Sequence, residues 1–181
     1  MTEHDLSATK QIPSCVEIGL EASARGDYQL ARQMLHTAME QLDGCEDKQI
    51  RLVELISNIA DTYLHEGNFD SAKNWYMKAL IRCELSQGAN TLRAGCLMAR
   101  LAQVIALQSD LAEFKKQLDN LMHTFLLAPE ESISLLLDPL VDLSWALCVK
   151  GCVPEVQSVN GLISHIKQLE EEDRLASFSA A

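Results

Sequence analysis

The sequence is poor in residues that interrupt regular structure. Among its 181 residues there are four prolines and eight glycines, and aromatic residues make up 5%. No segment alternates apolar and polar residues over a β-branched run, which argues against a sheet. The apolar content of 48% is nevertheless that of a folded chain. These features predict an all-α protein whose few glycines and prolines stand at the ends of helices.

Long apolar segments are also missing. The stretch from Ile133 to Val149 is interrupted by two serines and two aspartates, and a membrane span needs roughly 18 consecutive apolar residues. Residues 1–10 have no apolar core of a signal peptide. We therefore expect a cytoplasmic protein that does not bind a membrane.

Positive charge is scarce. Lys and Arg number 15 against 26 Asp and Glu, which gives a net charge of −11 and a pI near 4.8. A protein that binds a phosphate backbone needs clustered Lys and Arg, so we expect no nucleic-acid partner. An acidic surface favours a basic or amphipathic segment of another protein instead.

Signatures of catalysis and of metal binding are absent. There is no glycine-rich phosphate loop and no His-Glu-x-x-His pair. Cys148, Cys152 and His165 would supply three zinc ligands, but no source of a fourth is evident, so structural free thiols explain these cysteines better. His65 lies near Asp61 in sequence, yet no nucleophile accompanies them. We expect no enzyme, no cofactor and no metal.

The clearest pattern in the chain lies between Ile56 and Leu80. Two apolar stripes with helical spacing flank a turn: Ile56, Ile59, Ala60 and Tyr63 before it, and Ala72, Tyr76 and Ala79 after it. Gly67 supplies the backbone freedom to end the first helix, and Asn68 is a good cap for the second. The small alanines let two helices approach closely. The stretch therefore predicts a helical hairpin.

The same turn recurs at regular spacing along the chain. It is centred on Gly26, Gly67, Ser109 and Gly151, which are separated by 41, 42 and 42 residues. Each turn is preceded and followed by apolar or small residues at helical spacing. The regularity predicts four consecutive helical hairpins, and the short connections suit antiparallel neighbours.

This pattern resembles the tetratricopeptide repeat (TPR) family. The first two copies match it well, whereas the third has Ser109 in place of the turn glycine and Phe114 in place of the first alanine of helix B, and the fourth has Asn160 in place of the aromatic. Because the usual repeat has ~34 residues, the longer spacing is similar to the kinesin-light-chain type or the bacterial peptide-sensor type. The resemblance implies a right-handed α-solenoid of about four hairpins, with the first helix of each, helix A, lining the concave side.

One repeat domain is expected over residues 12–172, between a flexible N-terminal tail at 1–11 and a flexible C-terminal tail at 173–181. The helices are expected to start near Pro13, Tyr28, Glu46, Phe69, Asn90, Asp110, Glu130 and Pro154.

Helix-A positions that packing does not need line the binding groove in the family, which implies candidate partner-binding residues here. These are Glu17 in the first copy, Glu54, Asn58, Asp61 and His65 in the second, Arg100 and Gln103 in the third, and Asp142 and Trp145 in the fourth. Leu20, Ser23, Ser57, Ala99, Val141 and Cys148 occupy neighbouring groove positions. Asn58 and Gln103 suit a peptide backbone, since a side-chain amide both donates and accepts hydrogen bonds.

Three functions remain open. The first is a non-catalytic interaction module, or adaptor, that holds a peptide or helix of another protein in the helix-A groove. The second is a structural subunit that self-associates or docks on a larger assembly through its C-terminal helices, because the last helix is more apolar than one buried stripe requires. The third is a secretion-type TPR-like chaperone, which the long repeat disfavours. The clamp of Lys, Arg and Asn that holds chaperone tails in related proteins is missing, with Leu20, Ser57 and Asp61 among the residues at its positions.

Overall fold

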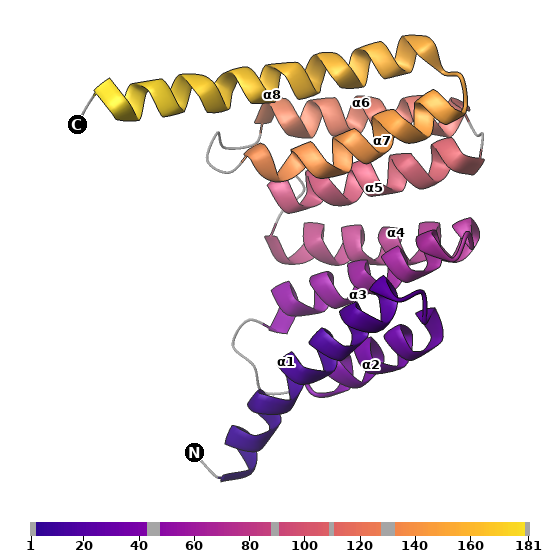
Figure 1. Ribbon diagram of the computed structural model, residues 1–181, viewed down its shortest axis with the longest axis vertical. Helices are drawn as coiled ribbons and strands as arrows, with labels where there is room; N and C mark the ends of the chain where they lie inside the picture. Colours follow the sequence, from indigo (N-terminus) through magenta and orange to yellow (C-terminus); the bar gives the residue numbers. More distant parts are fainter. Residues whose placement is uncertain (1–2, 43–47, 88–90, 109–110, 128–132, 180–181) are drawn as a thin grey trace. The chain divides into compact units, whose positions relative to one another are not determined.

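The computed structural model describes residues 3–42, 48–87, 91–108, 111–127 and 133–179 (Figure 1). These residues form eight α-helices and one 3-10 helix, and no strand occurs among them. The prediction of an all-α helical-repeat protein is confirmed. The chain divides into two compact units, residues 1–88 and 89–181. Each is described by itself, and the single domain over residues 12–172 stays a prediction.

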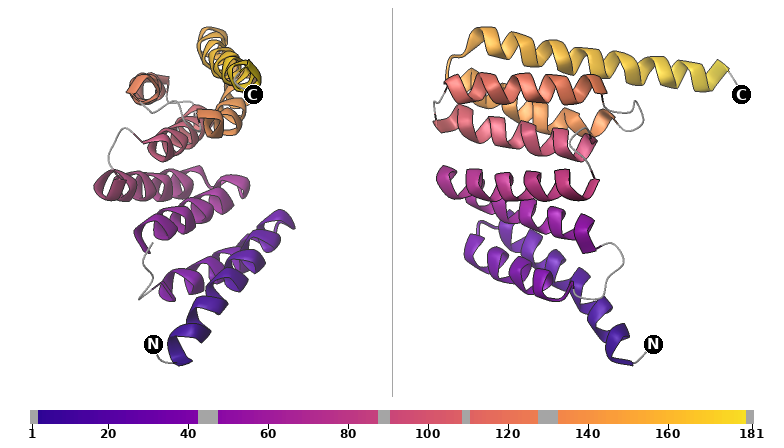
Figure 2. Two further views of the ribbon diagram at one scale, coloured as in Figure 1. Left: turned by 90° about the vertical axis from the view of Figure 1, so that its left-hand side faces the viewer. Right: turned by 180° about the vertical axis from the view of Figure 1, so that it is seen from behind.

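Unit 1 consists of two helical hairpins. The first pairs α1 (Glu3–Ala24) with α2 (Tyr28–Glu40), and the second pairs α3 (Lys48–His65) with α4 (Phe69–Gln87). The hairpins meet mainly through α2 and α3, as the views in Figures 1 and 2 show.

Unit 2 also contains two hairpins, but they meet through different helices. α5 (Leu92–Gln108) pairs with α6 (Leu111–Leu127), and α7 (Leu137–Val149) pairs with α8 (Val153–Ser179). The 3-10 helix η1 (Ile133–Leu136) leads into α7 and packs against α5, α7 and α8. The hairpins contact each other through α5 and α7, the first helix of each.

Three of the four predicted turns have the same backbone geometry. Gly26, Gly67 and Gly151 have positive φ angles of 81°, 81° and 72°. In each turn the glycine N–H donates to the carbonyl three residues back, and the next N–H donates to the carbonyl five residues before it, at 2.9–3.0 Å. This pair of hydrogen bonds satisfies carbonyl groups in the last turn of the helix, and it needs a residue in the left-handed backbone conformation. The turn predicted at Ser109 lies outside the described residues.

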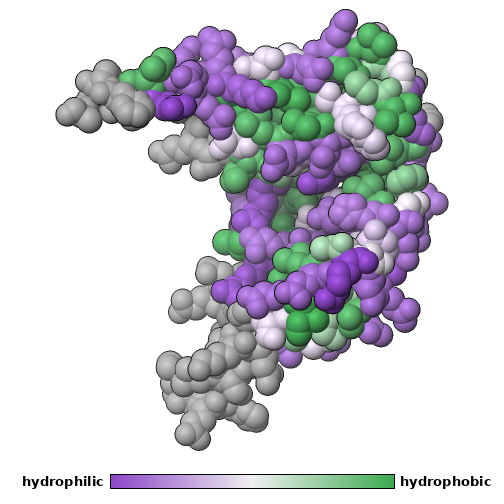
Figure 3. Space-filling model, viewed as in Figure 1, coloured by the Kyte–Doolittle hydropathy of each residue, from purple (hydrophilic) through white to green (hydrophobic). Residues whose placement is uncertain are grey.

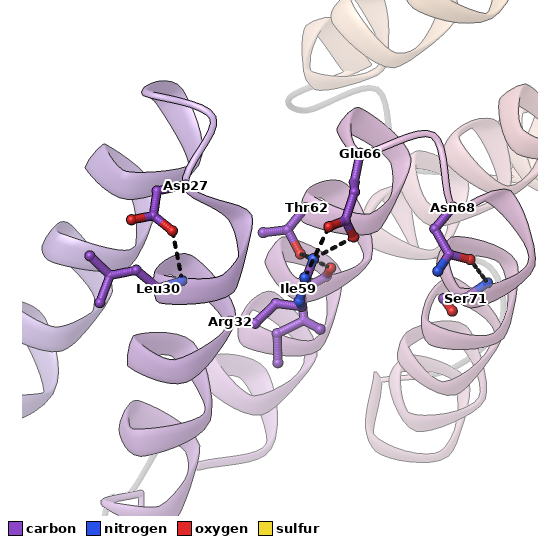
Figure 4. Close-up of polar contacts among 8 residues, drawn as sticks. All are labelled: Asp27, Leu30, Arg32, Ile59, Thr62, Glu66, Asn68 and Ser71. Carbon is purple, nitrogen blue, oxygen red and sulfur yellow. Dashed lines mark hydrogen bonds and ion pairs between the residues drawn. The ribbon is translucent and has the colours of Figure 1, made fainter.

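Side-chain caps begin the second helix of each hairpin in unit 1 (Figure 4). Asp27 Oδ1 accepts from the backbone N–H of Leu30 at 3.1 Å, and Asn68 Oδ1 accepts from that of Ser71 at 3.2 Å. Both caps satisfy an amide that has no partner within the helix. The cap predicted at Asn68 is therefore confirmed.

The two units place their small core residues on different helices. In unit 1 the second helices bury alanines at equivalent positions, Ala31 and Ala38 in α2 and Ala72 and Ala79 in α4. In unit 2 the position of Ala31 and Ala72 is taken by Phe114, which is fully buried. There the small residues lie on helix A instead, since α5 buries Ala94, Gly95, Ala99, Ala102 and Ala106.

Two helices extend beyond the predicted ends of the repeat domain. α1 begins at Glu3 rather than near Pro13, and α8 continues to Ser179 rather than ending near Glu172. Good helix formers such as Leu6, Ala8 and Leu175 lie beyond the predicted boundaries, and their helix propensity favours continuation of both helices. α7 begins at Leu137, so that Pro139 lies in its first turn, where a missing N–H costs nothing.

Candidate functional site

An open groove lies between the two first helices of unit 1, α1 and α3. At one end is a pocket of about 360 Å³ lined by Val16, Glu17, Leu42, Arg51, Glu54, Leu55 and Asn58. At the other is a pocket of about 250 Å³ lined by Leu20, Ser23, Ala24, Leu35, Asn58, Asp61, Thr62 and His65. We call the two pockets together the α1/α3 groove. It contains all five of the candidate residues predicted in the first two copies, Glu17, Glu54, Asn58, Asp61 and His65.

Asn58 lies where the two pockets join, since it lines both. Its side chain is half-buried, and in the described part of the chain no hydrogen bond to another residue uses its amide. An amide in this position offers one acceptor and two donors to an incoming backbone.

Acidic side chains predominate in the α1/α3 groove. Glu17 and Glu54 are exposed at one end and Asp61 is half-buried at the other, against a single Arg51. Asp61 is held in place because its carboxylate accepts a hydrogen bond from the hydroxyl of Tyr76, a fully buried residue of α4. The groove therefore has carboxylates at both ends, and Tyr76 fixes the one that belongs to Asp61.

The end of the groove near His65 is supported from behind by α2. The His65 ring lies 6.4 Å from that of Tyr28, centroid to centroid. Arg32 binds both carboxylate oxygens of Glu66 at 2.9 and 3.3 Å (Figure 4). Its guanidinium carbon lies 4.4 Å from the centre of the Tyr63 ring. These contacts join α2 to the last turns of α3 and so fix the direction of the helix that bears the site.

The candidate residues of unit 2 form an internal network. Arg100 on α5 donates to the carboxylate of Asp142 on α7, and also to Gln103 Oε1 at 3.4 Å. Gln103 is buried, with 8% of its surface exposed, and its neighbour Ala99 is fully buried. The expectation that these α5 positions face an open groove is wrong for Ala99 and Gln103, because α5 packs against α7 as well as α6.

Trp145 differs from the other candidates in unit 2. It is 63% exposed on α7, one turn from Val141 (49%) and one from Val149 (59%). The three residues form an apolar row along the helix. Figure 3 shows apolar side chains (green) reaching the surface among polar ones (purple) in both units.

A second groove in unit 1 escaped the sequence reasoning. It measures about 660 Å³ and is lined by Met39, Gln49, Ile56, Trp75, Lys78, Ile81, Arg82, Leu85 and Ser86. We call it the α4 groove. The sequence signal for it is the pair of apolar residues Ile81 and Leu85, four positions apart on α4, and the structure shows both of them exposed.

The remaining predictions concern metal and membrane. In the ranges that the structure describes, no three His, Cys, Asp or Glu side chains are placed to hold a metal ion. The five cysteines in those ranges are free thiols, with Cys83 buried and Cys148 exposed, and Cys45 lies outside them. None of the described helices is both long and apolar enough to cross a membrane.

Comparison with known proteins identifies one segment. Residues 53–80, the hairpin of α3 and α4 without its outer ends, match the family model of the tetratricopeptide repeat. This hairpin supports a TPR-family repeat. No curated protein matches the chain. TPR repeats are in general protein-binding modules, and the matched segment contains Glu54, Asn58, Asp61 and His65 from the α1/α3 groove.

Proposed function

We propose that unit 1 is a non-catalytic protein-interaction module, or adaptor, which holds a basic or amphipathic segment of another protein in the α1/α3 groove. The observation that carries the proposal is the gathering of Glu17, Glu54 and Asp61 around the unused amide of Asn58. Carboxylates attract Lys or Arg on the segment, while the amide is suited to bond its backbone.

The apolar part of the groove supports the same class of ligand. Leu20 is 46% exposed at the His65 end, and Val16 lies at the other end beside Glu17. A segment with apolar residues on one face and basic residues on its flanks matches this lining, as in other cases where an amphipathic helix binds a groove. The 42-residue spacing of the turns supports a kinesin-light-chain-like form of the repeat, and we propose a cytoplasmic location.

The test uses two display libraries of amphipathic peptides, one rich in Lys and Arg and the other rich in Asp and Glu. We expect enrichment from the basic library only. The double variant Glu17→Lys with Glu54→Lys should weaken the selected peptides by about tenfold or more, which corresponds to about 1.4 kcal/mol. Salt should weaken binding to the natural protein more than binding to the variant, because exposed charges are screened.

The matched control reverses the same number of charges elsewhere. Glu40 and Asp119 are exposed and line neither pocket of the groove, so Glu40→Lys with Asp119→Lys should leave the affinity unchanged. Asn58→Ala should weaken binding severalfold and leave its salt dependence intact. Equal enrichment from both libraries, or equal loss in the control, would contradict the proposal.

A further inference from the structure

The α4 groove has the opposite chemistry to the α1/α3 groove and shares no lining residue with it. Its apolar part is formed around Trp75, with Ile81 54% and Leu85 85% exposed. Its charged residues are Lys78 and Arg82, and none of its lining residues is an Asp or Glu. In a chain with a net charge of −11, this is a place where cations and exposed apolar side chains coincide.

The two cations are positioned over the groove by neighbours. The Lys78 ammonium lies 4.2 Å from the centre of the Trp75 ring, and Arg82 donates to Gln49 Oε1 at 3.3 Å. Neither contact neutralises a charge, since a ring and an amide are both uncharged. Both cations therefore remain able to pair with a carboxylate that enters the groove.

The helix α8 provides a segment with matching chemistry. Its buried residues Val159, Leu162, Ile163 and Ile166 pack in unit 2. After Ile166 no described side chain of α8 is fully buried, yet the helix runs on to Ser179. Figure 1 shows this part extending past the ends of the other helices of unit 2. We call residues 167–179 the α8 arm; it is roughly 20 Å long at 1.5 Å per residue.

The α8 arm is acidic and carries exposed apolar residues. Glu170, Glu171 and Glu172 are exposed, and the one cation among the next two residues, Arg174, lies 3.7 Å from Glu171. Leu169 is half-buried and Leu175 is 60% exposed. A helical segment of this length is marginal in water without a surface to pack on.

We propose that the chain self-associates, the α8 arm of one copy docking in the α4 groove of a second copy. Glu170–Glu172 then face Lys78 and Arg82, while Leu169 and Leu175 add to the apolar surface formed by Trp75, Ile81 and Leu85. Two reciprocal contacts of this kind close a symmetric dimer. The docking leaves the α1/α3 groove open, so it does not depend on the function proposed for that groove.

The experiment measures the mass of the full chain by light scattering and sedimentation from about 1 to about 300 μM, the range expected for a small interface. The mass should rise from 20.1 kDa to twice that value. Lys78→Glu with Arg82→Glu should keep the protein monomeric, and so should Glu171→Lys with Glu172→Lys. An equimolar mixture of the two variants should form a mixed dimer, because each supplies the charge that the other requires.

The controls separate this result from general charge effects. Both variants keep a net negative charge, so overall attraction does not explain a mixed dimer. Arg25→Glu with Lys116→Glu, two exposed cations outside the groove, should leave the dimer intact, as should Glu17→Lys with Glu54→Lys. Circular dichroism verifies that each variant is folded, and Leu85→Ser provides a second, uncharged way to weaken docking.

Three results would overturn the proposal. The first is a monomer at every concentration. The second is a dimer that survives reversal of either charged set. The third is failure of the mixed pair to associate although each variant is folded and monomeric, which would mean that the two surfaces do not meet.

Discussion

In each of the two units an arginine–carboxylate pair joins the hairpins, but the two pairs connect different helices. In unit 1 Arg32 of α2 binds Glu66 of α3, so the second helix of one hairpin is tied to the first helix of the next. In unit 2 Arg100 of α5 binds Asp142 of α7, which ties the two first helices to each other. The same interaction thus supports two ways of stacking hairpins.

The positions of small residues account for this difference. In unit 1 the buried alanines lie on the second helix of each hairpin, α2 and α4, and let neighbouring helices approach these two closely. α6 has Phe114 at the equivalent position, whereas α5 is rich in Ala and Gly and is contacted by both α6 and α7. The stacking determines which candidate residues are accessible. α7 covers α5, so that Gln103 is buried, whereas Asn58 on α3 lines an open pocket.

The largest expected effect comes from removing Phe114, the bulky residue of unit 2. Phe114→Ala should destabilise the protein by about 3–5 kcal/mol, because a fully buried phenylalanine leaves a cavity that the surroundings fill only in part. Hydrogen exchange measured by mass spectrometry should show the loss of protection in residues 91–179. Equal loss in residues 14–87 would show that the two units unfold together. Lys116→Ala, at an exposed position on the same helix, is the control and should change stability little.

The next test concerns a close approach of α1 and α2 in unit 1. A Cβ at Gly19 would lie 3.1 Å from Leu35 Cγ and 3.3 Å from the carbonyl oxygen of Ala31. Gly19→Leu should therefore separate α1 from α2 and cost about 1–3 kcal/mol or more, the usual penalty of overpacking. Trp75 fluorescence, measured in a Trp145→Phe background, reports unfolding of unit 1 during urea titration.

A matched glycine in unit 2 provides the control for that test. Gly161 also lies inside a helix, and a Cβ there would meet nothing within 4 Å. Gly161→Leu should leave stability unchanged or raise it by up to about 1 kcal/mol, since leucine has the higher helix propensity. A loss at Gly161 as large as that at Gly19 would contradict the role assigned to close approach.

The sequence alone was sufficient to predict the helical hairpins, and the candidate residues that it indicated in unit 1 do line a groove. Their role in binding a partner stays a prediction. Helical spacing and the glycine turns are local properties, and Gly26, Gly67 and Gly151 all have the backbone that their position predicts. Asn58 and Asp61 could be placed because their hairpin follows the family pattern closely. The burial of Gln103 could not be predicted, because it depends on which neighbouring helix covers α5. Packing between hairpins determines that.

The smallest expected effect comes from the ion pairs themselves. Arg32→Met and Arg100→Met retain an apolar stem but remove the charge, and each should cost about 0.5–1 kcal/mol, because the carboxylates are 41% and 46% exposed to screening solvent. The cost should be larger at Arg32, which also lies over Tyr63 and reaches Thr62 at 3.5 Å. Chemical denaturation at low and high salt measures the difference, with Lys116→Met as the control. If the small residues determine how the hairpins stack, both variants will keep the natural pattern of hydrogen exchange. A redistribution of protection between α5 and α6 in Arg100→Met would show instead that the ion pair determines which helix packs against α7.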